Sequence, residues 1–118
     1  MTQHSGDVVL VRYPFSAGQG AKVRPAVIIQ SDHNNVRLPN TIIAQLTTNT
    51  SRTHESTQVL VDPATPEGQS SGLRAPSAVT CENLVTIHES LISRTIGRLS
   101  DPLMRQVNAA LKASLALP

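Results

Sequence analysis

The apolar residues of this chain are arranged in short, largely β-branched runs, and most of these runs are bounded by proline, glycine, serine or asparagine. Such runs are typical of strands, and none is long enough for a buried helix. We expect strands at residues 8–13 (VVLVRY), 26–30 (AVIIQ), 41–48 (TIIAQLTT), 57–61 (TQVLV), 77–82 (SAVTCE, continued by NLVTI) and 94–99 (RTIGRL).

The apolar period changes only at the carboxyl end of the chain. In SDPLMRQVNAALKASLAL the apolar residues recur at spacings of three and four, which predicts an amphipathic helix. Ser100 or Asp101 can cap its first turn, and Pro102 suits that turn. Five or six short strands with one closing helix indicate a small, strongly bent antiparallel sheet or barrel covered by a helix.

The segments between the expected strands are rich in turn residues. We expect a loop with two glycines and a proline at residues 14–23 and a turn at residues 31–35. Residues 62–76, with three prolines and two glycines, are expected to form a long mobile loop. Pro25 favours extended geometry for Arg24. Arg24 should therefore stand at the start of the second strand, held by a rigid element.

Length favours one domain over residues 1–118, because 118 residues lie near the modal size of a single domain. Cys81 is the only cysteine, so no internal disulfide can form. The first residues do not have the charged segment and following apolar run that are typical of a signal peptide, and no apolar run approaches the roughly 18 residues that span a bilayer. We therefore expect a soluble, cytoplasmic protein that does not engage a membrane.

Several function classes are disfavoured by composition and spacing. With aromatic residues at 2%, recognition of RNA by an array of stacking side chains is excluded. The four histidines and Cys81 are scattered without ligand spacing, so we expect neither a metal nor a cofactor. The chain has no P-loop and no GxGxxG motif. Cys81 itself is expected to be an inert residue in an apolar strand.

The remaining polar residues gather at the ends of the expected strands. Arg24 begins the second strand, Thr47 closes the third, and Arg52 follows in the next loop. A guanidinium and a hydroxyl on adjacent strand ends can hold one phosphate group. The residues by themselves equally allow an Arg24 that forms a surface ion pair and a Thr47 that is an ordinary strand residue.

An ordered set of segments resembles the MazF/PemK family of type II toxin-antitoxin endoribonucleases. The segments are GDVVLVRYPF, VRPAVIIQSD, TIIAQLTT, SAVTCENLVTI and the helix ending ALKASLAL, which together extend from Gly6 to Leu117. The most specific pieces are the RPA signature at Arg24 to Ala26 and the threonine at the end of the third strand.

The resemblance implies an SH3-like β-barrel of five to seven strands with a C-terminal helix, usually a homodimer that a cognate antitoxin neutralises. It implies metal-independent cleavage of single-stranded RNA (mRNA) in which the ribose 2′-OH attacks the adjacent phosphorus, leaving a 2′,3′-cyclic phosphate and a 5′-OH. Carried over by motif, the catalytic residues are Arg24, Thr47 and Glu82. The residues expected to contact RNA are Phe15, Gln19, Lys22, Thr48, Asn49, Ser51 and Arg52.

The sequence departs from the family pattern at two places, and it leaves two alternative functions open. The loop before Lys22 lacks the HEQ or SEQ-type segment of many members, and Thr80 stands where some carry a second arginine. The alternatives on the same fold are a non-catalytic, gyrase-targeting toxin of the CcdB type and an inactive relative that only binds RNA. A small structural β-barrel in a larger assembly fits the composition but not the ordered motifs.

Overall fold

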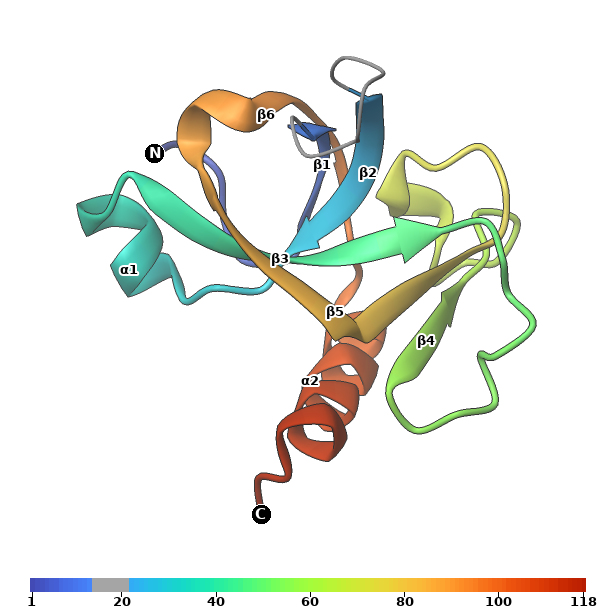
Figure 1. Cartoon of the computed structure of the whole chain (residues 1–118). Coiled ribbons are helices and arrows are strands. Elements are labelled where there is room, and N and C mark those ends of the chain that lie inside the picture. Colours follow the sequence, from blue (N-terminus) through green and yellow to red (C-terminus); the bar gives the residue numbers. More distant parts are fainter. Residues whose placement is uncertain (14–21) are drawn as a thin grey trace.

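A computed structural model of the chain describes residues 1–13 and 22–118, which fold around one curved antiparallel sheet (Figure 1). Its strands follow the order β4-β5-β3-β2-β1-β6. They are β1 (Asp7–Tyr13), β2 (Lys22–Ile28), β3 (Asn40–Thr47), β4 (Gln58–Val61), β5 (Ser77–His88) and β6 (Ile92–Arg98). The expected bent sheet with a C-terminal helix is confirmed. Within the described residues the sheet is open, with β4 and β6 as its edges.

The long strand β5 is continuous where the sequence indicated a strand and a short continuation. Its pairing with β3 shifts between Ala44 and Gln45, so that Ala44 lies opposite Leu84 and Gln45 lies opposite Thr80. Such an irregularity bends a strand and increases its twist. The first half of β5 can therefore pair with β4 as well, while its second half follows the rest of β3.

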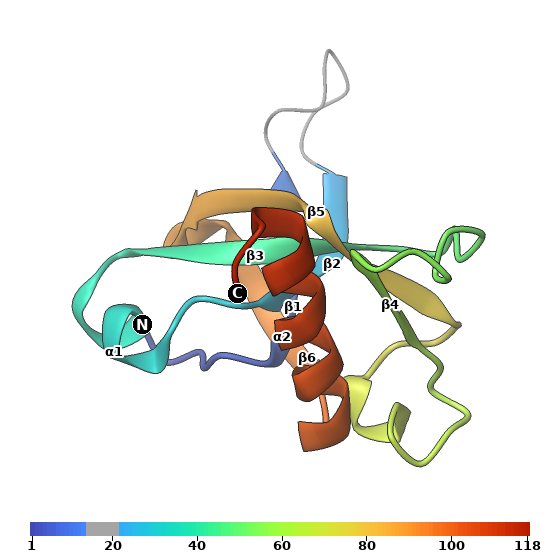
Figure 2. The same ribbon diagram turned by 90° about the horizontal axis from the view of Figure 1, so that it is seen from below.

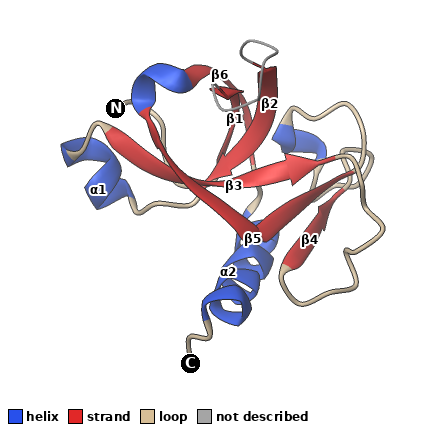
Figure 3. Ribbon diagram, in the orientation of Figure 1, coloured by secondary structure: helices blue, strands red, loops and turns tan. Residues whose placement is uncertain are grey.

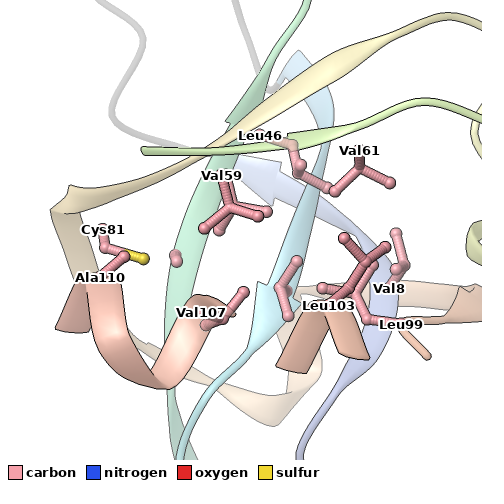
Figure 4. Packing of buried hydrophobic residues seen from close by; sticks show 12 residues of the cluster. Val8, Leu46, Val59, Val61, Cys81, Leu99, Leu103, Val107 and Ala110 are labelled. Carbon is pink, nitrogen blue, oxygen red and sulfur yellow. The ribbon is translucent and has the colours of Figure 1, made fainter. Parts of the chain in front are cut away.

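The C-terminal helix α2 (Asp101–Leu115) lies across one face of the sheet, as Figure 2 shows. The Ser100 hydroxyl accepts a hydrogen bond from the Leu103 N–H at 3.5 Å, which confirms one of the two expected caps. No helix in the described part of the chain is long and apolar enough to cross a membrane. The buried side chains of α2 join those of the sheet in a first core, which includes Leu46, Val59, Val61, Val79, Cys81, Leu103, Val107 and Ala110 (Figure 4).

The opposite face of the sheet has a second apolar core near β1 and β2. Successive residues of a strand point to opposite faces. Val9 and Val11 therefore belong to this second core while Val8 belongs to the first. Ile28 and Ile43, which lie opposite each other on β2 and β3, complete its centre. On this face of the sheet, the side chains near the carboxyl end of β3 are polar and no longer apolar.

A short helix, α1 (Asp32–Arg37), occupies the segment for which a turn was expected at residues 31–35, and Figure 3 shows it beyond one end of the sheet. That expectation was wrong because six residues contain too few apolar positions to reveal a helical period. The large apolar residue Val36 is even 78% exposed. Polar contacts hold the helix instead: the Ser31 hydroxyl caps it, and Asn35 is the helix residue whose side chain is buried.

The segment 62–76 is packed against β6, although the sequence indicated a long mobile loop. It contains the 3-10 turn η1 (Gln69–Ser71), and a second such turn, η2 (Glu89–Leu91), precedes β6. The Ser70 hydroxyl donates to the Arg98 carbonyl at 2.8 Å. Gly72 has a φ of +74°, and a Cβ at this position would lie 2.0 Å from the Ile96 carbonyl oxygen. Glycine thus permits both the turn and its close approach to the sheet.

Candidate nucleic-acid interface

A row of polar side chains crosses three strands on the face turned away from α2. Thr80 of β5 lies opposite Gln45 of β3 on one side and opposite Gln58 of β4 on the other. Their chain neighbours Leu46, Val59 and Val79 all point into the core beneath α2. Because side chains alternate along a strand, the polar row must face the other way.

This row forms the floor of a polar pocket of about 280 Å³. Residues from β3, β4, β5 and the loop after β3 line it: Gln45, Leu46, Thr47, Asn49, Arg52, Gln58, Thr80 and Asn83. Three residues selected from the sequence, Thr47, Asn49 and Arg52, are therefore brought together in one concave site. Thr80, which replaces an arginine of some family members, adds a hydroxyl and no charge.

Thr47 is held at the end of β3 by the loop that follows it. Its Oγ1 accepts a hydrogen bond from the backbone N–H of Asn49 at 3.1 Å. The Asn49 side-chain oxygen in turn accepts from the backbone N–H of Ser51 at 3.1 Å and from its hydroxyl at 2.8 Å. These local bonds fix the rotamer of Thr47 and leave its own hydroxyl hydrogen available to a ligand. Thr48 is exposed beside them.

Arg24 projects from β2 on the same face as the pocket. Ala26 and Gln45 are the last paired residues of β2 and β3, and residues directly opposite each other share a face. Arg24 lies two residues before Ala26 and Thr47 two residues after Gln45, so both side chains keep that face. Beyond this pair the two strands spread apart (Figure 1), with Arg24 on one strand and Thr47 on the other.

Lys22 adds a second exposed cation at the amino-terminal end of β2. It lies opposite Tyr13 of β1, while Arg24 lies opposite Val11. Burial raises the pKa of Tyr13 to about 12, and the charge of Arg24 acts against this rise. The phenol is therefore neutral at physiological pH and brings no negative charge to compete for Arg24. Lys22 and Arg24 are strand residues here, whereas the sequence assigned Lys22 to the preceding loop.

Arg52 closes the far side of the pocket from the loop after β3. Its Nε lies 2.5 Å from a carboxylate oxygen of Glu55. Both side chains are substantially exposed, so this ion pair contributes little to stability and can open when a phosphate competes for the guanidinium.

Glu82 does not line the pocket itself but contacts residues that surround it. Its two carboxylate oxygens accept hydrogen bonds from the Thr57 hydroxyl and from the Gln58 amide, the latter at 2.9 Å. Glu82 thus contacts the site through Gln58, a residue that the sequence interpretation missed. The sequence shows a glutamine at the second residue of the expected strand 57–61, but nothing in the sequence connects it with Glu82 or with the pocket.

Two of the residues expected to contact RNA, Phe15 and Gln19, lie outside the described residues. A larger cavity of about 500 Å³ lies elsewhere, between Leu10, Pro25, Leu73 and Arg94, and holds none of the expected catalytic residues. Arg74 also lines this larger cavity, but the polar pocket at Thr47 is the one that contains residues expected at the site.

Cys81 lies in the first core, next to Glu82. Burial and then the Glu82 carboxylate raise the pKa of its thiol to about 11. The thiol is therefore protonated at neutral pH and is no nucleophile there, in keeping with the sequence interpretation. Among residues 1–13 and 22–118, no three His, Cys, Asp or Glu side chains come together in an arrangement that could hold a metal ion.

Comparison with known proteins gives the same family as the motifs. Residues 4–115 match the model of the PemK-like, MazF-like toxin of type II toxin-antitoxin systems. The chain is 30% identical over 104 residues to endoribonuclease EndoA of Bacillus subtilis, covering 88% of this chain and 85% of the relative. It is 29% identical over 113 residues to endoribonuclease MazF of Staphylococcus saprophyticus, covering 95% and 90%.

A solved structure supports the fold. The Mycobacterium tuberculosis toxin MazF-mt6 superposes with a TM-score of 0.77 at 25% identity, covering 95% of this chain and 98% of that one. The family match extends over nearly the whole chain and includes every strand that builds the pocket. This chain therefore belongs to the PemK-like, MazF-like family of toxins from type II toxin-antitoxin systems.

Proposed function

We propose that this protein is a toxin endoribonuclease that cuts single-stranded mRNA at short specific sequences without a metal ion. The observation that carries the proposal is that Arg24 and Thr47 share one face of the sheet, on which Thr47 lines the polar pocket. The family assignment and the names of the two curated relatives, both endoribonucleases, support it.

In the proposed reaction the nucleophile belongs to the substrate. The ribose 2′-oxygen forms a bond to the adjacent phosphorus as the bond from phosphorus to the 5′-oxygen breaks. The 2′-OH loses its proton and the leaving 5′-oxygen gains one, which leaves a 2′,3′-cyclic phosphate and a 5′-OH end. No water is consumed, and no protein side chain becomes covalently attached.

Negative charge accumulates on the non-bridging phosphate oxygens during this step. Arg24 would stabilise that charge with its fork of donors, and Thr47 would donate its free hydroxyl hydrogen to the same group. Arginine is a poor base because it stays protonated, so its role is electrostatic, with proton donation to the leaving oxygen second. We assign Glu82 to positioning, because its carboxylate is engaged by Thr57 and Gln58.

The RNA path would run past the exposed polar residues around this site, namely Lys22, Thr48, Asn49, Ser51 and Arg52. A cognate antitoxin that covers this face and a second copy of the chain are the partners we propose, with the cytoplasm as the place of action. A gyrase-targeting toxin would have no use for a phosphate-binding pair at this position.

The direct test is cleavage of a long RNA by the purified protein in EDTA, with the cut sites and end groups mapped. We expect cuts at one short sequence, cyclic phosphate at the upstream end and 5′-OH at the downstream end. A matched protein with Arg24→Ala shows whether the activity belongs to this site. Cleavage that needs added Mg²⁺, or that leaves 5′-phosphate ends, would overturn the proposal.

A further inference from the structure

The geometry points to Gln58 as a base-reading residue: the pocket beside Thr47 accepts a nucleobase that carries an amino group and discriminates against uracil. This inference rests on the proposed function, since it identifies which chemical feature of the RNA the site selects.

Gln58 is only 8% exposed, yet one of its polar atoms has no hydrogen-bond partner. Its Nε2 donates to Glu82 Oε1 at 2.9 Å, whereas its own buried Oε1 has no partner among the described residues. An unpaired buried acceptor carries a desolvation cost that a ligand can remove. Gln58 lines the pocket, but its Oε1 is buried, so a ligand provides the missing donor only where the side chains around this oxygen move apart.

A flip of the Gln58 side-chain amide would not remove the cost of the unpaired acceptor. If Oε1 and Nε2 exchanged places, the amide oxygen would face the Glu82 carboxylate, and two acceptors would oppose each other. Glu82 is held in turn by the Thr57 hydroxyl. Glu82 therefore holds the Gln58 amide with its nitrogen engaged and its oxygen unpaired, which makes Glu82 a positioning residue for recognition.

A second acceptor lies beside the first. Thr80 is 4% exposed, and its hydroxyl donates to the Gln45 carbonyl at 2.8 Å. Since its hydrogen is engaged, Thr80 can only accept from a ligand. Thr80 and Gln58 are opposite each other on β5 and β4, so the buried floor presents two neighbouring acceptors.

An amino group matches two acceptors because it has two hydrogens to donate. Adenine, cytosine and guanine each carry one on their base edges. Uracil has a single ring N–H between two carbonyl oxygens, which would meet the acceptors unfavourably. A volume of about 280 Å³ leaves room for one base beside the phosphate contacts of Thr47. A site that pairs a buried polar group with a ligand hydrogen rejects the analogue that lacks it.

The first test compares base preferences of the wild type with those of Gln58→Met, using RNA with randomised sequence around the cleavage site. At one position the wild type should favour amino-bearing bases over uracil, and the variant should lose about tenfold of that preference. Gln69→Met, the same change at an exposed glutamine outside the pocket, is the matched control. Identical preferences of wild type and Gln58→Met at every position would overturn the inference.

The second test removes the amino group from the RNA and leaves the protein unchanged. At the selected position, adenine is replaced by purine, cytosine by 2-pyrimidinone or guanine by hypoxanthine. The wild-type kcat/KM should fall about tenfold on the analogue, and Gln58→Met should respond little, as a double-mutant cycle requires. Equal effects in both proteins would contradict the inference. The wild-type arm also covers the case in which Gln58→Met fails to fold.

Glu82→Gln separates positioning from proton transfer. A neutral amide at position 82 can face Gln58 with either its oxygen or its nitrogen, so the preference should weaken at the same RNA position as in Gln58→Met. A uniform loss of kcat on all sequences with an altered pH profile would instead assign Glu82 to catalysis. If the wild type cuts no RNA, the proposed function fails, and binding of 2′-O-methyl RNA with and without the amino group still tests the base pocket.

Discussion

The backbone N–H of Asn49 donates to Thr47 Oγ1 at 3.1 Å. The bond occupies one lone pair of the hydroxyl and leaves its hydrogen to be donated, in a direction fixed by the loop. A threonine in the middle of a strand has no such constraint, so the position directly before the loop turns a common strand residue into an oriented donor.

Thr47→Val should lower the rate of RNA cleavage about 100-fold, since removal of one donor to a developing oxyanion costs roughly that much. Valine keeps the β-branched shape, so the strand end should remain intact. Thr47→Ser retains the donor and should keep most of the activity. Single-turnover cleavage in EDTA measures both, and equal rates for Thr47→Val and wild type would contradict the proposed donor.

Arg24→Ala should reduce cleavage by about 100-fold to 1000-fold, because the charge that stabilises the phosphate is lost. Arg24→Lys should fall between wild type and alanine, because an ammonium lacks the bidentate fork. Arg24 is exposed, so the melting temperature should stay unchanged. Arg105→Ala, at an exposed position on α2, is the control for losing one positive charge.

The elements that could be predicted from the sequence are those with a sustained period. The β-branched runs predicted all six strands to within a few residues, and the spacing of Leu103, Val107 and Ala110 predicted the buried face of α2. Helix α1 was missed because its stability comes from Ser31 and Asn35 and not from apolar spacing. Single-residue polar networks of this kind have no periodic signature.

The candidate site could be predicted from the sequence only in part, for a related reason. Residues at strand ends, such as Arg24 and Thr47, could be assigned to one region from the sequence pattern and the family resemblance. Gln58 could not, because its role depends on the β4–β5 register that places it opposite Thr80 and near Glu82. That register joins segments more than twenty residues apart.

Asn35→Ala should lower the free energy of unfolding by about 3 kcal/mol, because it leaves buried donors and acceptors unpaired. Asn35 is 1% exposed; its side-chain oxygen accepts from Gln30 at 2.9 Å and Thr41 at 2.8 Å, and its amide donates to the Gln30 carbonyl. Asn108→Ala, at an exposed position on α2, should change stability by less than about 0.5 kcal/mol. Urea denaturation compares the two, and similar losses would contradict a structural role for this network.

Replacing Cys81 should alter how stability responds to alkaline pH. The pKa of the folded thiol is raised from 9.0 to about 11, so between these values the unfolded chain loses a proton that the folded chain keeps. The unfolded state then binds fewer protons, and the free energy of unfolding falls as pH rises through that window. Cys81→Ala removes this proton and should flatten the decline between about pH 9 and 11, measured by urea denaturation under reducing conditions.

Tyr13, whose pKa is raised to about 12, titrates in both proteins, so its effect on stability cancels in the comparison. Equal slopes for the two proteins would show that the thiol ionises as readily in the folded state as in the unfolded one.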